Sequence, residues 1–301
     1  DLDSAGVYFN SSGDAAAITL RYKMELLWTQ KEKANVVVLG SSRSLNGINP
    51  LLFDSTFNVI NLSNVPNSNY VSEYLFDNYV LIHVKNLKYL IISLDLDMWW
   101  KVENQASDNF FYEDYRKYPG YIYDKNHDFW KDVSTEKIVE ATVNSEGMAF
   151  YDSAFVPSRG FNGFTECLGW GAEAFLDNNP NWFKENPKAF DDNLNVLERM
   201  VEKAENRNIY VVGIIFPQSP GYKKTDFMGR YGMPRMSALQ AIDDVSAISK
   251  RHRNFILWDQ NLMGDHDYVN EESENYDHLC TKGAEKLTHR LDSLMRSLEK
   301  K

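Results

Sequence analysis

The chain has 301 residues, of which 43% are hydrophobic and 25% are charged, as in a globular protein with a substantial core. This mixture excludes extensive disorder, collagen-like repeats and coiled-coil arrays. The 43 acidic residues outnumber the 32 basic residues and give a formal net charge of −11. We therefore expect no nucleic-acid partner and no anionic membrane surface as a partner, because binding phosphates requires clustered basic side chains.

Apolar runs and apolar periodicity predict the elements of the fold. Short runs rich in β-branched residues predict buried parallel strands, and spacing of three and four predicts helices. The strands are expected at 35–40, 57–61, 87–94, 209–216 and 254–258, and the main helices at 15–28, 72–83, 191–206 and 282–299. This alternation favours a three-layer α/β/α sandwich around a mostly parallel, flavodoxin-like sheet, within one domain over residues 1–301.

A long segment at about 99–187 interrupts this alternation. It is rich in aromatic residues and contains glycine-rich stretches at 159–163 and 169–171. Because a structureless loop of this length is uncommon in a compact domain, we predict an insertion with a few short helices. The insertion either only packs over one end of the sheet or forms a cap over a binding cleft, with Arg159 and Trp170 as candidate substrate contacts.

The cysteines and the ends of the chain indicate where the protein resides. The two cysteines, Cys167 and Cys280, form no CxxC motif, and their spacing permits a disulfide without establishing one. Our interpretation of Cys280 is a buried small residue beneath the last helix. No apolar run reaches the roughly 18 residues of a membrane span. Since the chain begins without Met, we expect an exported protein (secreted, periplasmic or at the cell surface) or a piece of a larger modular one.

Chemistry is expected at the carboxyl ends of the parallel strands. The first predicted strand runs into GSSRS at residues 40–44, where a serine could be an exposed nucleophile or a simple helix N-cap. Near the other end of the chain, His278 precedes the last helix and has Asp277 beside it. A histidine with an acidic neighbour can act as the general base for a serine.

These positions resemble the SGNH hydrolase superfamily, which includes the GDSL-type esterases, over about residues 35–298. VVVLGSSRS (36–44) looks like the first block of that superfamily and NYDHLCTKGAEKLT (275–288) looks like the last. The resemblance implies that Ser42 is the nucleophile and His278 the base, with no cofactor. Ser41 replaces the usual Asp, as in relatives that acylate cell-surface polysaccharides or teichoic acid.

The chain departs from the pattern of the superfamily at the residue that orients the histidine. Asn275 stands where an acid is usual. Asp277 could take that role, or a Ser–His dyad could suffice. The third block also lacks its Asn and contains Asp95 and Asp97. These carboxylates could orient His278 or carry a structural hydrogen bond.

The oxyanion-binding block departs from the pattern as well. Residues 57–68 look like this second block, but Ser63 or Pro66 stands where a glycine is usual. Because proline has no N–H, Asn64 or Asn67 could supply the donor instead. Arg43, next to the nucleophile position, could bind an acidic substrate group. We favour an ion pair of Arg43 with Asp95 or Asp97.

The residues together predict a serine esterase that removes O-acyl groups, preferably acetyl groups of a carbohydrate. The alternatives are an O-acyltransferase acting on an extracellular polysaccharide and a non-catalytic carbohydrate-binding or scaffold domain. No metal site is expected. GDHD at 264–267 holds three adjacent ligand types, and adjacent ligands rarely converge on one ion, which favours a polar loop.

Overall fold

The computed structural model describes residues 15–65, 67–100, 157–172 and 188–300, together with 134–136, 139, 140, 143, 174 and 176. Five strands form one sheet in the order β2-β1-β3-β4-β7, and every neighbouring pair is parallel. Their bounds are Val36–Leu39 (β1), Val59–Asn61 (β2), Tyr89–Ser93 (β3), Tyr210–Ile215 (β4) and Phe255–Asp259 (β7). The predicted parallel sheet is thereby confirmed, with the flavodoxin-like order.

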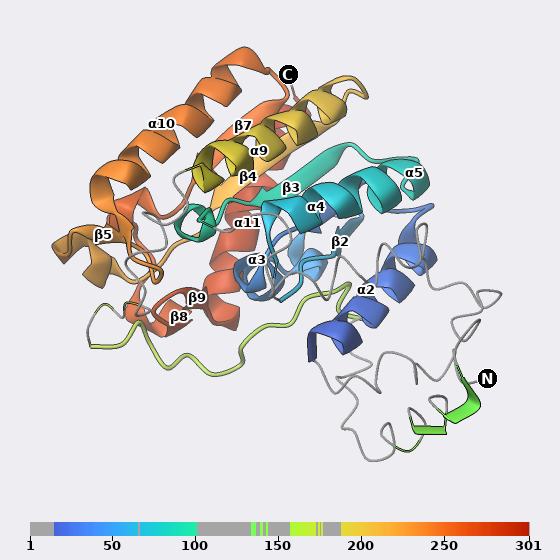
Figure 1. Cartoon of the computed structure of the whole chain (residues 1–301), viewed down its shortest axis with the longest axis horizontal. Coiled ribbons are helices and arrows are strands. Elements are labelled where there is room, and N and C mark those ends of the chain that lie inside the picture. The colour runs from blue at the N-terminus through green and yellow to red at the C-terminus, as the bar shows by residue number, and fades with distance from the viewer. Residues whose placement is uncertain are drawn as a thin grey trace.

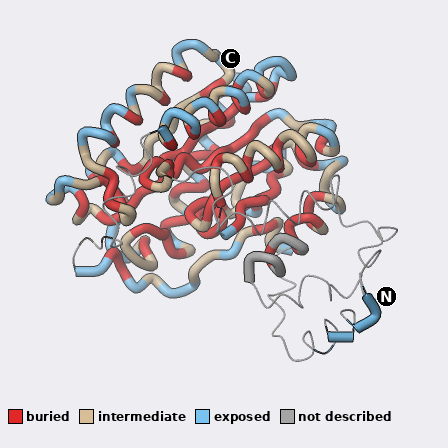
Figure 2. Tube along the Cα trace, in the orientation of Figure 1, coloured by how far each residue is buried: buried red, intermediate tan, exposed pale blue. Residues whose placement is uncertain are grey.

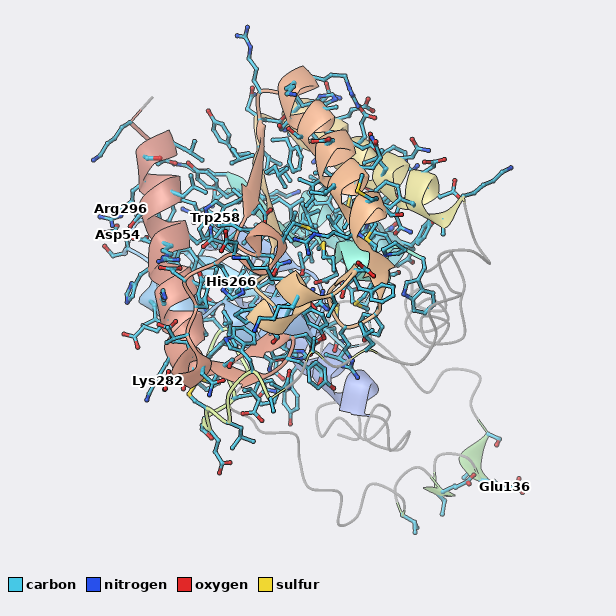
Figure 3. The ribbon with its side chains drawn as sticks, turned by 90° about the vertical axis from the view of Figure 1, so that its left-hand side faces the viewer. Asp54, Glu136, Trp258, His266, Lys282 and Arg296 are labelled. Carbon is cyan, nitrogen blue, oxygen red and sulfur yellow. A yellow bond between two sulfur atoms is a disulfide. The ribbon has the colours of Figure 1, made fainter. Side chains whose placement is uncertain are left out.

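Helices cover both faces of the sheet (Figure 1). Successive side chains of a strand point to opposite faces, so Val37 and Leu39 lie in one core cluster while Val36 and Val38 lie in the other. The first cluster is closed by α2 (Ala15–Gln30), α4 (Asn69–Leu75), α9 (Ala189–Glu205) and α10 (Arg235–Arg251). The second cluster is closed by α11 (Thr281–Leu298). Figure 2 shows the resulting buried layer between exposed outer helix faces, and Figure 3 shows α11 and α10 on opposite sides of β7.

Short elements complete the described part of the chain. They are α3 (Ser42–Gly47), α5 (Leu81–His83), the hairpins β5 (Phe227–Met228)–β6 (Met233–Pro234) and β8 (Ser273–Asn275)–β9 (His278–Leu279), and single helical turns at Pro50–Leu52, Leu96–Met98, Pro220–Lys224, Leu262–Gly264 and Asn270–Glu272. A π-helical turn, Phe76–Val80, joins α4 to α5. No helix of the described residues combines the length and apolar character needed to cross a membrane.

Three elements differ from the sequence-based expectation. The predicted helix at 72–83 is the combination of α4, the π-helical turn and α5, and it begins earlier because Ser68 Oγ caps the N–H of Val71. The helix after β1 begins at Ser42, with Ser41 as its N-cap. The structure adds α10, whose buried face contains the small residues Ala238 and Ala241 and therefore gives a weak apolar signal.

Much of the expected insertion at 99–187 lies outside the described residues. The described stretch 157–172 runs along α3 and the β8–β9 hairpin. Its anchors include the hydrogen bonds from Asn162 N to Leu45 O (3.2 Å) and from Gly169 N to Ser273 O (2.9 Å). This stretch therefore lies beside the carboxyl edge of β1.

The sharp turn between β1 and α3 predicts a stability effect. Gly40 has a φ of 155°, and a Cβ there would lie 2.4 Å from both Ser44 Oγ and Ser93 Cβ. We expect Gly40→Ala to lower the free energy of unfolding by about 2–4 kcal/mol, because backbone strain and a steric clash add. Gly232→Ala is the control, since a Cβ there meets no atom within 4 Å, and should cost about 1 kcal/mol of strain. Urea unfolding of both variants measures the difference, and equal losses would contradict the turn geometry.

Candidate active site

Ser42 and His278 meet at the carboxyl edge of the sheet. Ser42 is the first residue of α3, directly after β1, and Ser41 Oγ accepts a hydrogen bond from Arg43 N at 3.2 Å as the N-cap. His278 begins β9, and its Nε2 lies 2.7 Å from Ser42 Oγ. The imidazole is almost buried, whereas Ser42 is partly exposed. This is the spacing of a serine nucleophile and its general base.

Both candidate orienting residues lie at the other ring nitrogen of His278. Nδ1 hydrogen-bonds to Asn275 Oδ1 at 3.1 Å, and the same oxygen accepts the N–H of Asp277 at 3.1 Å. Asp277 Oδ1 also lies close to the ring, 2.9 Å from Nδ1. The tight turn of the β8–β9 hairpin produces this arrangement, because it pairs Asn275 with His278 and folds Asp277 back. With Nδ1–H donating to Asn275, Nε2 is free to accept the proton of Ser42.

Asp277 is ionised by its surroundings. Its Oδ2 lies 3.3 Å from Arg43 Nη2 and 3.8 Å from Arg230 Nη1. Burial raises the pKa of the Asp277 carboxyl, but the charge and hydrogen bond of His278 and the charges of Arg43 and Arg230 outweigh burial and hold this pKa below its usual range. A negative charge therefore stands beside the His278 ring.

Arg43, the residue after Ser42, is the centre of a buried charge cluster. Its Nη1 and Nη2 contact the two carboxylate oxygens of Asp97 at 2.6 and 2.9 Å, and Nη1 contacts Asp95 at 3.2 Å. Burial lowers the pKa of the Arg43 guanidinium, but Asp97, Asp95 and Asp277 raise it well above its usual value. The expected ion pair is present. The alternative that Arg43 binds an acidic substrate group is therefore wrong, and Asp97, also a candidate site residue, is buried against the Arg43 guanidinium.

The two asparagines expected at the oxyanion site lie in different surroundings. Asn64 is buried beside the turn after β1, and its N–H donates to Gly40 O at 3.0 Å. Its Oδ1 accepts the N–H of Val65 at 2.7 Å. Asn67 instead donates its Nδ2 to Ser72 Oγ of α4 at 2.9 Å, so its amide group is hydrogen-bonded to that helix. Asn64 is thus held at the turn that leads from β1 to Ser42, whereas Asn67 is held at α4.

Arg159 and Trp170 lie in the stretch 157–172. Trp170 is only 4% exposed, packs in the second core cluster and donates its Nε1 to Tyr268 O at 3.3 Å. The expectation that Trp170 contacts substrate is therefore corrected, because its ring is covered. Arg159 is partly exposed, and its carbonyl accepts the N–H of Asn61 at 2.9 Å, so its backbone anchors the stretch beside β2.

A disulfide joins this stretch to the residue two positions after His278. Cys167 and Cys280 are bonded, and Cys280 is fully buried, so our interpretation of Cys280 as a small core residue is incomplete. Phe164 O accepts the N–H of Thr281 at 2.8 Å, and the Phe164 ring lies edge-on to the His278 imidazole at 5.7 Å. The described stretch therefore covers one side of the imidazole.

Three further side chains belong to the site and were missed by sequence reasoning. They are Gln218, Arg230 and Phe164. Gln218 follows β4, and its Oε1 accepts from Arg43 Nη2 at 3.2 Å and from Arg230 N at 3.1 Å. Gln218 could have been found from the sequence, because it is a polar residue that closely follows a predicted buried strand. Arg230 in the β5–β6 hairpin and Phe164 carry no comparable sequence signal.

The GDHD loop directs its side chains to separate partners. Asp265 pairs with Lys223 at 2.6 Å, His266 Nε2 lies 2.6 Å from Gln218 O, and Asp267 pairs with Arg290 at 2.5 Å. This divergence favours the polar-loop interpretation.

Comparison with known proteins gives only distant likenesses. No family model matches the chain, and no curated protein matches it. A solved structure provisionally described as a platelet activating factor, from Streptococcus pneumoniae, is 10% identical, with 92% of this chain and 91% of that chain covered and a TM-score of 0.49. Another, provisionally described as an acylhydrolase, from Bacteroides fragilis, is 14% identical, with 91% and 95% covered and a TM-score of 0.44.

The buried charge cluster predicts a large loss of stability when its cation is removed. Arg43→Met leaves buried carboxylates uncompensated and should lower the free energy of unfolding by about 3–5 kcal/mol. Arg199→Met is the control, because Arg199 pairs with Glu73 on the surface, and it should cost less than about 1 kcal/mol. Chemical denaturation measures both variants. A loss for Arg43→Met as small as that of the control would show that the cluster is not a stabilising ion pair.

The lowered pKa of Asp277 predicts a pH dependence of stability. A carboxylate whose pKa is lower in the folded state than in the unfolded state stabilises the fold. This stabilisation is fully present above the unfolded-state pKa of about 3.9, and it is lost as the pH falls through the folded-state pKa. Asp277→Asn should therefore be less stable than the natural chain at pH 7, and the difference should shrink below about pH 4. Urea titrations across this pH range test the sign. A difference that grows on acidification would contradict it.

Proposed function

We propose that this chain is a serine esterase of the SGNH type, with Ser42 as nucleophile and His278 as general base. The observation that carries the proposal is the 2.7 Å contact between Ser42 Oγ and His278 Nε2, with Asn275 and Asp277 at Nδ1. The pair stands at the carboxyl end of β1, next to β3, where the strand order reverses and ligands of such sheets bind.

The reaction takes two steps. Ser42 Oγ attacks the ester carbonyl while Nε2 of His278 takes the hydroxyl proton. The tetrahedral intermediate collapses, the C–O bond to the alcohol breaks, and His278 returns the proton to the departing alkoxide. Water then attacks acyl-Ser42, His278 accepts its proton, and the released Ser42 oxygen takes that proton back as the free acid leaves.

The developing oxyanion requires donors near Ser42. The Ser42 N–H stands at the start of α3, where N–H groups have no acceptor in the helix, and Asn64 lies beside the same turn. Asp95 and Asp97 would oppose an oxyanion if they were unpaired. Their pairing with Arg43 offsets this negative charge and makes the site compatible with acyl transfer.

The acyl group is proposed to be acetyl, and the alcohol a carbohydrate. The support is the resemblance of residues 36–44 and 275–288 to the superfamily, together with the aromatic content of the chain. The presence of Ser41 favours a second candidate, transfer of the acyl group from Ser42 to a polysaccharide hydroxyl instead of to water. The first step is the same in both, so hydrolysis and transfer differ only in the acceptor.

The proposed location is the exterior of the cell, the cell surface or the periplasm. The Cys167–Cys280 disulfide supports it, because disulfides persist mainly in oxidising compartments.

The test compares the natural chain with Ser42→Ala on 4-nitrophenyl acetate and on acetylated xylan. Loss of a serine nucleophile typically lowers kcat by about a millionfold, so the variant should show no activity above background. Ser44→Ala is the matched control, because Ser44 is a neighbouring serine whose Oγ hydrogen-bonds with Ser41 O at 3.0 Å and Ser63 Oγ at 2.8 Å instead of with His278. The variant should keep its activity.

The same assays separate the alternatives. Acetate release from xylan supports a carbohydrate esterase, and acetyl transfer to an added oligosaccharide in preference to water supports the transferase. If the natural chain is no more active than Ser42→Ala on every substrate, the esterase is rejected.

A further inference from the structure

A small polar pocket lies next to the charge cluster. It is formed where β3 ends and α4 begins, and its lining includes Ser93, Asp95, Asn69, Trp99 and Asn193. It has room for a group about the size of one water molecule. The mechanism above does not use this pocket.

Two buried N–H donors of the lining have no partner. Asn69 Nδ2 and Trp99 Nε1 are both buried without a hydrogen-bond acceptor among the residues that the structure describes. Trp99 is 2% exposed and Asn69 is 9% exposed. Because buried donors are almost always paired, with protein or with ordered water, these two groups need an acceptor that the described residues do not supply.

The charge in the pocket identifies the kind of acceptor. Asp95 accepts from Arg43 Nη1 at 3.2 Å and from Ser93 Oγ at 2.9 Å, and each carboxylate oxygen retains a lone pair. Its negative charge disfavours an anion. A hydroxyl group fits this chemistry, because its oxygen can accept from the two N–H groups while its proton is donated to the carboxylate.

The lining is held in place before a ligand enters. Asn193 of α9 donates its Nδ2 to Trp99 O at 3.2 Å and to Ala189 O at 2.8 Å, which fixes the backbone that carries the indole. Asp95 is fixed by Arg43, the neighbour of Ser42 in the chain. A Cβ on Gly40 would lie 2.4 Å from Ser93 Cβ, so the turn that leads to Ser42 packs directly against the pocket wall.

We propose that this pocket binds one hydroxyl group of the substrate, and that the substrate is an ester of a polyhydroxylated alcohol such as a sugar. The inference rests on the proposed esterase function and names its substrate class. Asn69 and Trp99 donate to the hydroxyl oxygen, and Asp95 accepts the hydroxyl proton. An ester without free hydroxyl groups reaches Ser42 without this anchor.

The kinetic test uses three esters and three variants. The esters are 4-nitrophenyl acetate, methyl 6-O-acetylglucopyranoside and the tri-O-methyl derivative of that glucoside, which lacks free hydroxyls. The variants are Trp99→Phe, Asn69→Ala and the control Trp100→Phe, since Trp100 is not among the lining residues of the pocket. Thermal unfolding of each variant confirms that it is folded.

The natural chain should prefer the hydroxylated glucoside over its methylated form. Trp99→Phe and Asn69→Ala should each reduce that preference by about five- to tenfold, the cost of one hydrogen bond. Their kcat/KM for 4-nitrophenyl acetate should stay the same, and Trp100→Phe should keep the full preference. An unchanged preference in both pocket variants, with 4-nitrophenyl acetate still hydrolysed, overturns the pocket and leaves the esterase standing. A natural chain inactive on all three esters overturns both.

A crystal structure of Ser42→Ala with the acetylated glucoside separates a sugar hydroxyl from a structural water. A glucoside hydroxyl within hydrogen-bond distance of Trp99 Nε1 and Asn69 Nδ2 supports the proposal. A water that keeps this place while the glucoside is bound overturns it.

Discussion

The arrangement of the site depends on the buried guanidinium of Arg43. It binds Asp95 and Asp97 after β3 and also Asp277 in the β8–β9 hairpin. These segments are far apart in the sequence, and a shared cation fixes them at one edge of the sheet. Buried carboxylates require such compensation, because an isolated charge is costly in a medium of low polarity. Since Arg43 directly follows Ser42, the ion pairs also restrain the position of Ser42.

The ion pair of Arg43 with Asp277 also affects the surroundings of His278, where Asn275 and Asp277 both lie at Nδ1. Arg43 and Arg230 attract one carboxylate oxygen of Asp277, and the other carboxylate oxygen lies 2.9 Å from Nδ1 of His278. The neutral Asn275 takes the N–H and sets the orientation of the ring. An amide oxygen can fill this place, as Cys–His–Asn arrangements of other enzymes show. In this arrangement Asp277 places a negative charge beside the His278 ring, and the hydrogen bond to Asn275 fixes the orientation of the ring.

The sequence allowed the sheet and the two central residues to be predicted because both follow from local patterns. Runs such as 36–39 and 210–215 are apolar and β-branched, which is typical of strands buried on both faces. Ser42 follows a strand and His278 precedes a helix, and the resemblance of these two blocks to the SGNH superfamily singled out the two residues together. The parallel topology then brings these positions to one edge.

The remaining contacts depend on side-chain packing that chain order does not determine. The pairing of Asn275 with His278 places both orienting candidates at Nδ1, whereas the sequence left a choice between them. Trp170 lies in a glycine-rich segment typical of an exposed loop, yet its ring is packed against the sheet. The Cys167–Cys280 bond joins residues 113 positions apart, which no spacing rule predicts.

Active-site labelling with a fluorophosphonate, followed by mass spectrometry of the peptides, tests the central claim most directly. The reagent forms a covalent bond only with an activated serine, so the account predicts one label, on Ser42, with much slower labelling in His278→Ala. Ser41 and Ser44, on either side, serve as internal controls and should remain unmodified. Absence of label from the natural chain, or a label on another serine, would contradict the pairing of Ser42 with His278 as nucleophile and base.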